Sequence, residues 1–213
     1  MFISAFDLDF TLLNDNSSYR FGRYLCAQKH IPRSFLFFIT WCHISFLFGW
    51  MSLPQLHENA FKKLFYKKKA SLIEKWVEEF LALQFNDLLY QPAIQKLKAA
   101  QLAGHLTVIL SSSPAFLVKP IAKLLNVPVW KSTEYQIDDD GDYSHINSLM
   151  LGETKASFIQ GLQSQNGLTS EDVIAYSDSH FDLPFLFAAG AAVGVNPDRK
   201  LRAICRQNQW PII

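Results

Sequence analysis

Residues 2–13 read Phe-Ile-Ser-Ala-Phe-Asp-Leu-Asp-Phe-Thr-Leu-Leu. The apolar run at the start predicts a buried strand, which ends in two carboxylates, Asp7 and Asp9, followed by Thr11. Carboxylates at the end of a buried strand are costly to desolvate unless something pairs with them. The carboxyl ends of the strands in an open parallel sheet are also where ligands bind. The segment therefore predicts either a divalent-cation site, with one oxygen free for chemistry, or a solvated turn.

Two more segments carry groups that could bind an anion. A predicted strand at 106–110 runs into Ser111-Ser112-Ser113-Pro114, whose hydroxyls and free N–H groups at a helix N-terminus suit an anion. Lys155 stands at the start of an apolar-periodic helix over about 156–162. Each feature also has an ordinary interpretation, a helix-starting loop for the serines and a solvated charge for the lysine.

A further segment adds two carboxylates. Residues 173–176 predict a strand that runs into Asp178, and Asp182 lies four residues on, one helical turn away if a helix starts there. Together with Asp7, these side chains could complete the oxygen-rich site that Mg²⁺ prefers. The alternative for Asp182 is helix capping near Pro184.

These parts fit phosphoryl transfer through a carboxylate nucleophile. A carboxylate such as Asp7 can attack phosphorus and form an aspartyl-phosphate, which splits one displacement into two easier steps. The reaction also needs a hard cation, a positive side chain and an acid that protonates the leaving oxygen. Asp9 would point to the same side as Asp7 in an extended strand, whereas a bend in the chain would let it reach across the scissile bond.

The order strand–Asp-x-Asp, strand–Ser, Lys and strand–Asp-x-x-x-Asp resembles the haloacid-dehalogenase-like (HAD) phosphohydrolases over essentially the whole chain. The likeness is closest to the branch with an all-helical cap, subfamily IB, which includes phosphoserine phosphatase. It extends to residues 111–122, 176–184 and 195–204. The resemblance implies an enzyme with a Rossmann-like, doubly wound parallel α/β sheet, an inserted helical cap of the C1 type and Mg²⁺ as cofactor.

The resemblance also implies a role for each motif residue. Asp7 would be the nucleophile, and Asp9 the general acid and base. The predicted phosphate-binding residues are Ser111, Ser112, Thr11 and Lys155. The predicted metal-site residues are Asp7, Asp9 through its backbone carbonyl, Asp178, and Asp182 in support.

The chain departs from the family pattern at Phe10, Ser112 and Ser177, where many members have glycine. Phe10 places a large ring beside the predicted nucleophile and could narrow or reshape the pocket. Phosphoserine phosphatases carry a glutamate shortly after the first motif that meets the substrate ammonium group, whereas this chain has Asn16 with Asp15 beside it. We therefore expect a small-molecule phosphate other than phosphoserine.

Predicted strands alternate with helical patterns, which favours a parallel sheet with helices on both faces. Residues 16–87 show no strand alternation and predict the cap, so that the core comprises residues 1–15 and 88–213. Residues 133–148 predict a β-hairpin whose acidic turn is expected to be solvated rather than a second metal site. The strands are expected at about 2–7, 106–110, 127–130, 173–177 and 191–195, with helices such as 92–103 and 114–125 between them.

Composition agrees with a compact intracellular enzyme. A chain of 213 residues suffices for one sizeable core and a small insert. The 20 basic and 19 acidic residues give no electrostatic case for nucleic acid as a partner. The three cysteines are widely spaced and are expected as reduced thiols. The N-terminus has no basic leader or cleavage site, so a cytoplasmic location is expected.

The segment 35–53 contains nineteen residues without a formal charge, near the ~20 that a helix needs to span a bilayer. His43 and Gly49 argue against a span, which would also place the two halves of the core on opposite sides of a membrane. We expect a cap helix buried on several sides, or an interfacial contact with lipid or a second subunit. Lys62, Lys63 and Lys67–Lys69 could attract anionic headgroups or form a solvated helix face. The chain is expected to be a monomer or a homodimer.

The sequence as a whole predicts a Mg²⁺-dependent phosphomonoester hydrolase whose cap closes over the substrate. One alternative is a phosphotransferase, which would use an added alcohol in place of water. The other is a HAD-fold scaffold without activity, which would bind lipid or a protein partner. Retention of every expected catalytic side chain favours the enzyme.

Overall fold

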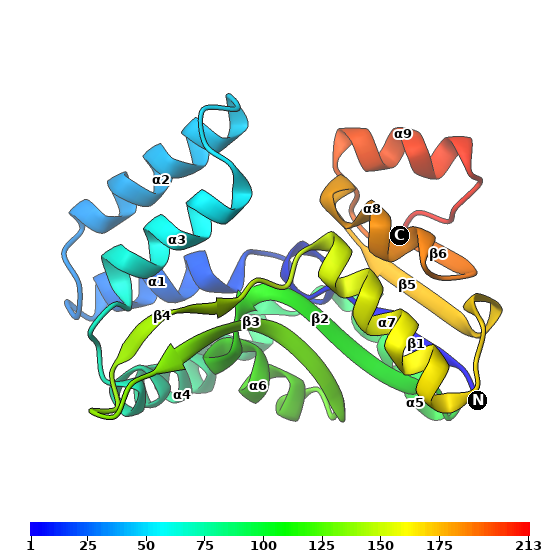
Figure 1. Ribbon diagram of the computed structural model, residues 1–213, viewed down its shortest axis with the longest axis horizontal. Helices are drawn as coiled ribbons and strands as arrows, with labels where there is room; N and C mark the ends of the chain where they lie inside the picture. Colours follow the sequence, from blue (N-terminus) through cyan, green and yellow to red (C-terminus); the bar gives the residue numbers. More distant parts are fainter.

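The computed structural model describes residues 1–213 and places one six-stranded sheet at the centre of the fold (Figure 1). The strand order is β4-β3-β2-β1-β5-β6, and all neighbours are parallel except β3 and β4. The predicted parallel α/β sheet is therefore confirmed. The strands are β1 (Ile3–Phe6), β2 (Leu106–Pro114), β3 (Val129–Ile137), β4 (Tyr143–Ser148), β5 (Val173–Ser177) and β6 (Ala191–Gly194).

Nine helices accompany the sheet. Four of them occupy residues 17–88 with no strand between them, as expected for a helical insert. Short helical turns lie at Leu8–Leu12, Ser170–Asp172 and His180–Asp182. The helices are α1 (Ser17–Ala27), α2 (Ser34–Leu47), α3 (Leu53–Leu64), α4 (Ala70–Leu88), α5 (Gln91–Leu102), α6 (Ala115–Leu124), α7 (Gly152–Asn166), α8 (Leu183–Phe187) and α9 (Arg199–Gln207).

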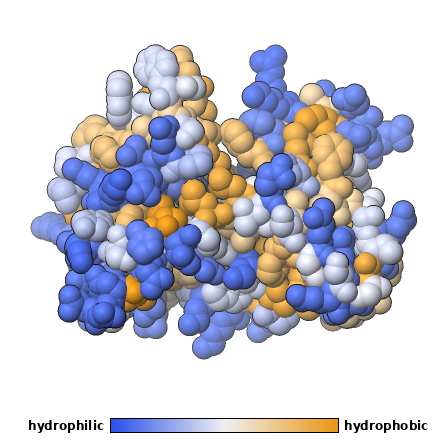
Figure 2. Space-filling view, viewed as in Figure 1, coloured by the Kyte–Doolittle hydropathy of each residue, from blue (hydrophilic) through white to orange (hydrophobic).

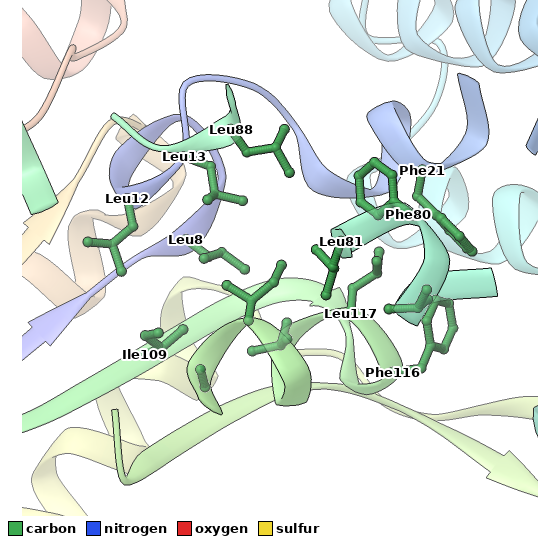
Figure 3. Close-up of a cluster of buried hydrophobic side chains, with 14 of the residues drawn as sticks. Leu8, Leu12, Leu13, Phe21, Phe80, Leu81, Leu88, Ile109, Phe116 and Leu117 are labelled. Carbon is green, nitrogen blue, oxygen red and sulfur yellow. The ribbon is translucent and has the colours of Figure 1, made fainter. Parts of the chain in front are cut away.

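The central strand β1 has a hydrophobic core on each face, because successive side chains of a strand point to opposite sides. Ile3 and Ala5 belong to a cluster with residues of α7, α8 and α9. Phe6 belongs to a larger cluster with residues of α1, α4, α5 and α6. Figure 3 shows part of this larger cluster, in which Phe21 of α1 and Phe80 of α4 lie near Leu117 of α6. The helices of 17–88 therefore share a core with the sheet.

Helices α2 and α3 lie side by side and rise away from the sheet (Figure 1). The turn between them contains Gly49 at a positive φ of 74°, a conformation that suits glycine. Ser52 and Gln55 then form a capping box that starts α3. Helix α2 buries Phe35 and Cys42, but its outer face is exposed, so the expected burial on several sides is wrong for that face. No helix has the length and apolar character that crossing a bilayer requires.

The connection between α3 and α4 pairs with the β3–β4 hairpin, which corrects the expectation for the lysines. Lys67 forms an ion pair with Asp138 at 2.8 Å, and Lys69 with Asp142 at 3.2 Å. The backbone N–H of Lys67 also donates to the carbonyl of Tyr143. The acidic turn is solvent-accessible, as expected, and two of its aspartates also pair with lysines. Lys67 and Lys69 lie between α3 and α4, so they do not form a solvated helix face. Opposite charges far apart in sequence meet here because the hairpin reaches back to the helical segment.

Candidate active site

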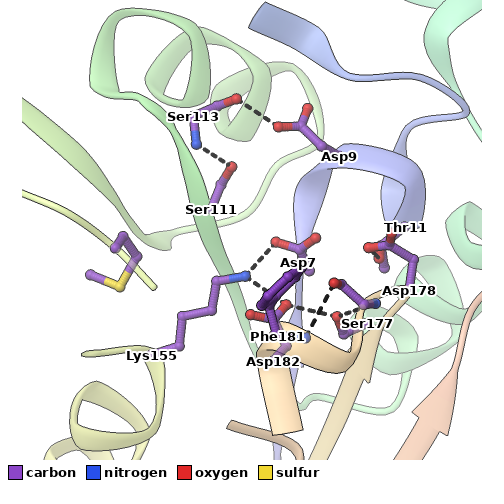
Figure 4. A network of polar contacts seen from close by, with 12 residues as sticks. Asp7, Asp9, Thr11, Ser111, Ser113, Lys155, Ser177, Asp178, Phe181 and Asp182 are labelled. Atoms are coloured by element: carbon purple, nitrogen blue, oxygen red, sulfur yellow. Dashed lines mark hydrogen bonds and ion pairs between the residues drawn. The ribbon is translucent and has the colours of Figure 1, made fainter. Parts of the chain in front are cut away.

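The predicted motif residues meet at the carboxyl ends of β1, β2 and β5 (Figure 4). The chain bends directly after β1, because Asp9 keeps extended backbone angles and Phe10 adopts φ 57° and ψ 1°. This is the left-handed region, which L-residues other than Asn and Asp rarely enter. The bend separates Asp7 from Asp9, so that the two side chains point to different partners. Of the two arrangements expected for Asp9, the structure has the bent one.

Lys155 binds two aspartates at the centre of the site. Its Nζ lies 2.6 Å from Oδ1 of Asp7 and 2.8 Å from Oδ2 of Asp182. The lysine side chain is only 3% exposed, so these charges are shielded from water. Burial alone would lower the pKa of Lys155, but Asp182 and Asp7 outweigh it and raise the pKa. The lysine therefore stays positively charged at any physiological pH.

Asp182 is held from a second direction as well. The hydroxyl of Ser177 donates to Oδ2 of Asp182 at 2.7 Å and accepts from the N–H of Ser179. Oδ2 of Asp182 thus receives bonds from both Lys155 and Ser177. In this structure Asp182 therefore holds the Lys155 ammonium group in position, and Ser177 holds the Asp182 carboxylate in position.

Gly152 lets the helix that carries Lys155 approach the loop that carries Asp182. A methyl group at this position would overlap the backbone carbonyl of Phe181 and press on Pro184. Only a residue without a side chain permits this contact. The positions of the lysine and of the Phe181 loop are therefore coupled through Gly152.

Asp9 lies in a separate cluster of neutral donors. The hydroxyl of Ser113 donates to Oδ2 of Asp9 at 2.6 Å, and the N–H of Ser17 donates to Oδ1 at 2.7 Å. Burial raises the pKa of Asp9, and the bonds from Ser113 and Ser17 oppose this increase only in part. A carboxyl group that holds its proton more tightly is suited to act as a general acid.

Sequence reasoning did not select Ser113, Ser17 or Ser177 as site residues. The three serines bond to motif carboxylates rather than carrying the chemistry themselves. The polar run 111–113 was the signal for Ser113, but which of its hydroxyls faces Asp9 depends on how β2 ends.

The other predicted phosphate-binding residues take different positions. Ser111 is fully buried, and its Oγ accepts from the N–H of Ser113 at 3.1 Å. Ser112 lies between them and is half-buried. The hydroxyl of Thr11 donates to Oδ1 of Asp178 at 3.2 Å, so in this structure it holds a carboxylate. The phosphate-binding role of these three residues stays a prediction.

Asp7 and Asp178, two of the predicted metal-site residues, influence each other's neighbourhood, since, besides burial, the charge of Asp178 raises the pKa of Asp7. Burial and the repulsion of Asp182 raise the pKa of Asp178 to about 7. Burial also raises the pKa of Asp7, against the attraction of Lys155. Two buried acids that resist ionisation fit a hard divalent cation, which would stabilise their charged forms. No group of three acidic, His or Cys side chains has metal-ligand geometry in this structure, and the metal-site role of Asp7, Asp9, Asp178 and Asp182 stays a prediction.

Comparison with known proteins places this constellation in a family. A family model described as haloacid dehalogenase-like hydrolase matches residues 5–186, which is most of the chain. The chain belongs to the haloacid dehalogenase-like hydrolases. The predicted family is therefore confirmed, and the protein is a hydrolase of that family.

Some relatives of this HAD hydrolase are named for an enzymatic activity, and others are not. It is 30% identical over 217 residues to the inhibition of morphological differentiation protein of Streptomyces azureus, covering 98% of this chain and 76% of that protein. It is 29% identical over 210 residues to a probable phosphatase of Mycobacterium tuberculosis, covering 98% and 73%. A solved structure of a protein with unknown function from Bordetella pertussis superposes with a TM-score of 0.88 at 24% identity, covering 99% and 97%. This last likeness confirms the fold.

Proposed function

We propose that this HAD hydrolase is a Mg²⁺-dependent phosphomonoesterase that acts through an aspartyl-phosphate on Asp7. The observation that carries the proposal is the separation of Asp7 and Asp9 into two environments. Asp7 contacts the Lys155 cation, whereas Asp9 contacts only neutral donors, the hydroxyl of Ser113 and the N–H of Ser17. Such a division lets one carboxyl act as nucleophile and the other as acid. The phosphatase relative supports the same reaction class.

The first half-reaction transfers the phosphoryl group to the enzyme. A carboxylate oxygen of Asp7 attacks phosphorus and forms an O–P bond while the ester O–P bond breaks. Lys155 offsets the negative charge of the phosphoryl oxygens, and protonated Asp9 gives its proton to the leaving alkoxide. The products of this step are the free alcohol and phosphorylated Asp7.

The second half-reaction returns the enzyme to its starting state. Asp9, now ionised, takes a proton from water, and the hydroxide attacks phosphorus of the aspartyl-phosphate. Inorganic phosphate leaves, the Asp7 carboxylate is regenerated, and Asp9 is protonated again. Ser113 and Ser17 hold the Asp9 carboxyl in place through both steps.

Asp7 and Asp178 would hold the Mg²⁺ ion, together with the backbone carbonyl of Asp9. When bound, Mg²⁺ neutralises the charge of the phosphoryl oxygens and orients them. Thr11 would keep the Asp178 carboxylate in position through its hydrogen bond.

Phosphate release from a broad panel of phosphomonoesters, with Mg²⁺ and with EDTA, tests the proposal. Wild type should turn over at least one ester only with Mg²⁺, and Asp7→Asn should lower that rate by about 10³-fold or more. The matched control is Asp139→Asn, which changes an exposed aspartate of the hairpin turn and should keep full activity. Full Mg²⁺-dependent activity in Asp7→Asn would contradict the proposal.

A further inference from the structure

Two phenylalanine rings meet beside the loop that carries Asp178 and Asp182. Phe46 of α2 and Phe181 have ring centroids 5.5 Å apart, at an interplanar angle of 43°. Phe46 belongs to the α2–α3 pair, and Phe181 belongs to the loop that carries Asp178 and Asp182. In Figure 1 these two parts of the chain stand on either side of a gap above the sheet. The ring pair joins them across that gap.

Phe181 is fixed relative to the reacting groups. It directly precedes Asp182, which binds Lys155, and its carbonyl contacts Gly152 at the start of α7. Figure 4 shows Phe181 in the same view as Asp7 and Lys155. The residue nevertheless remains 45% exposed. Phe181 therefore presents exposed surface on the loop that carries Asp178 and Asp182.

Exposed apolar side chains also follow Asp9 and Phe46 along the chain. Phe10, directly after Asp9, is 43% exposed, although its backbone has the strained positive φ. On the other side, Phe48 and Trp50 follow Phe46 along the chain, are exposed, and stack with centroids 5.3 Å apart. Figure 2 shows a notch between the two upper lobes with apolar residues gathered below it. Exposed apolar side chains therefore occur both directly after Asp9 and at the end of α2.

The polar side chains near the same loops already have partners. Asp15 contacts Arg20 at 3.5 Å, and the amide oxygen of Asn16 caps α1 through the N–H of Tyr19. His180 contacts Asp198 through Nδ1 at 2.7 Å. These polar side chains are therefore engaged by other residues of the chain.

We propose that the substrate is a phosphomonoester whose alcohol carries an apolar body, and that Phe46 and Phe181 contact that body. This inference rests on the proposed phosphomonoesterase function. The apolar body could belong to a soluble alkyl or aryl phosphate or to a lipid phosphate, since both present hydrocarbon next to the ester oxygen. Burial of a phenyl-sized group should favour its ester by roughly 10- to 100-fold in kcat/KM.

The test compares esters whose alcohols have similar acidity but differ in apolar area. Wild type with Mg²⁺ should hydrolyse 2-phenylethyl phosphate with a kcat/KM at least about 10-fold above that for ethyl phosphate. A second arm measures dodecyl phosphate embedded in vesicles of zwitterionic lipid. Faster turnover in the vesicle arm assigns the apolar body to a lipid, and faster turnover in the soluble arm assigns it to a soluble ester. Both results support the inference.

Variants then assign the preference to the two rings. Phe46→Ala and Phe181→Ala should each lower the ratio of the two soluble kcat/KM values by about 5-fold or more, and Phe46→Leu should lower it less. Phe37→Ala, on the exposed outer face of the same helix, should leave the ratio unchanged. Thermal unfolding of each variant shows whether it is folded.

The possible failures are distinguishable. Equal hydrolysis of both soluble esters, or a ratio that neither ring variant changes, would overturn the inference while the phosphomonoesterase function stands. No hydrolysis of any ester, with folded enzyme and Mg²⁺, would contradict the proposed function and this inference with it.

Discussion

Lysines pair with aspartates distant in sequence in two regions of this molecule. At the site, Lys155 binds Asp7 and Asp182, and its side chain is 3% exposed. At the hairpin, Lys67 pairs with Asp138, and its side chain is 54% exposed. The N–O distances are nearly the same, so the two regions differ in the solvent exposure of the ion pairs rather than in their geometry.

This difference in solvent exposure determines how much each ion pair contributes to stability. Water solvates and screens the exposed pair whether or not it forms, so such pairs add little stability. Removal of a partner from the buried network leaves charges without water or a counter-ion, which is strongly destabilising. Two buried acids around one lysine are also a costly way to build a core. The buried network is therefore best explained by chemistry, and the exposed one by the alignment of two segments.

Loss of the buried lysine should give the largest effect. Lys155→Met is expected to abolish Mg²⁺-dependent phosphate release and to lower the free energy of unfolding by about 3–5 kcal/mol, because Asp7 and Asp182 lose their counter-ion. Chemical denaturation and an activity assay check both effects. Lys96→Met, on an exposed position of α5, is the matched control. Wild-type stability in Lys155→Met would show that the network is not charged in the folded protein.

A smaller change should displace the lysine without removing it. Gly152→Ala is expected to lower kcat/KM by about 10-fold or more, because the new methyl group pushes α7 away from the Phe181 carbonyl. In Gly161→Ala, in the same helix, the new methyl group contacts no neighbour, so this variant should keep full activity. Its Tm should be unchanged or slightly higher. Steady-state kinetics and thermal unfolding measure the difference. Equal activity of the two variants would contradict the coupling between Gly152 and Lys155.

Stabilisation by Mg²⁺ should depend on pH. The folded-state pKa of Asp178, about 7, lies above its ordinary value of 3.8. Without metal, its contribution to stability is therefore lost as the pH rises through about 7. Since Mg²⁺ competes with that proton, the increase in Tm on adding Mg²⁺ should be a few degrees larger near about pH 8 than near about pH 5.5. Asp178→Asn should remove most of this difference, and a pH-independent increase would count against Asp178 as a ligand.

The exposed pair should give the smallest effect. Lys67→Ala is expected to change Tm by an amount close to the detection limit and to leave phosphate release intact, because both partners remain hydrated when separated. Any change should shrink further at high salt. Calorimetry at low and high ionic strength measures it. A loss of stability comparable to that of Lys155→Met would break the distinction drawn between the two regions.

Much of the fold could be predicted because its signals are local. The apolar runs before Asp7, Ser111 and Asp178 indicated three strands, and the structure places them as β1, β2 and β5. Hydrophobic periodicity likewise indicated α5, α6 and α7 within a few residues. The strand at 127–130 and the hairpin at 133–148 were predicted separately. In the structure one strand, β3, runs from Val129 to Ile137, since no glycine or proline interrupts it.

The features that could not be predicted are tertiary ones. Asp9 bonds to Ser113 and Ser17. These residues come together only when β1 and β2 pair, so the sequence around Asp9 does not reveal the contact. The contact of Thr11 with Asp178 spans 167 residues, and that of Lys67 with Asp138 spans 71. No local pattern encodes such contacts. The exposed outer face of α2 was missed for a related reason, since a helix that is apolar on all sides does not reveal which side is covered.

Trapping of the phosphorylated enzyme tests the central claim most directly. Enzyme turning over p-nitrophenyl phosphate with Mg²⁺ would be quenched in acid, reduced with borohydride and digested for peptide mass spectrometry. An aspartyl-phosphate is reduced to homoserine, so the account predicts homoserine at position 7, absent in Asp7→Asn and present in Asp139→Asn. Turnover without homoserine at position 7, or with homoserine at another aspartate, would contradict it.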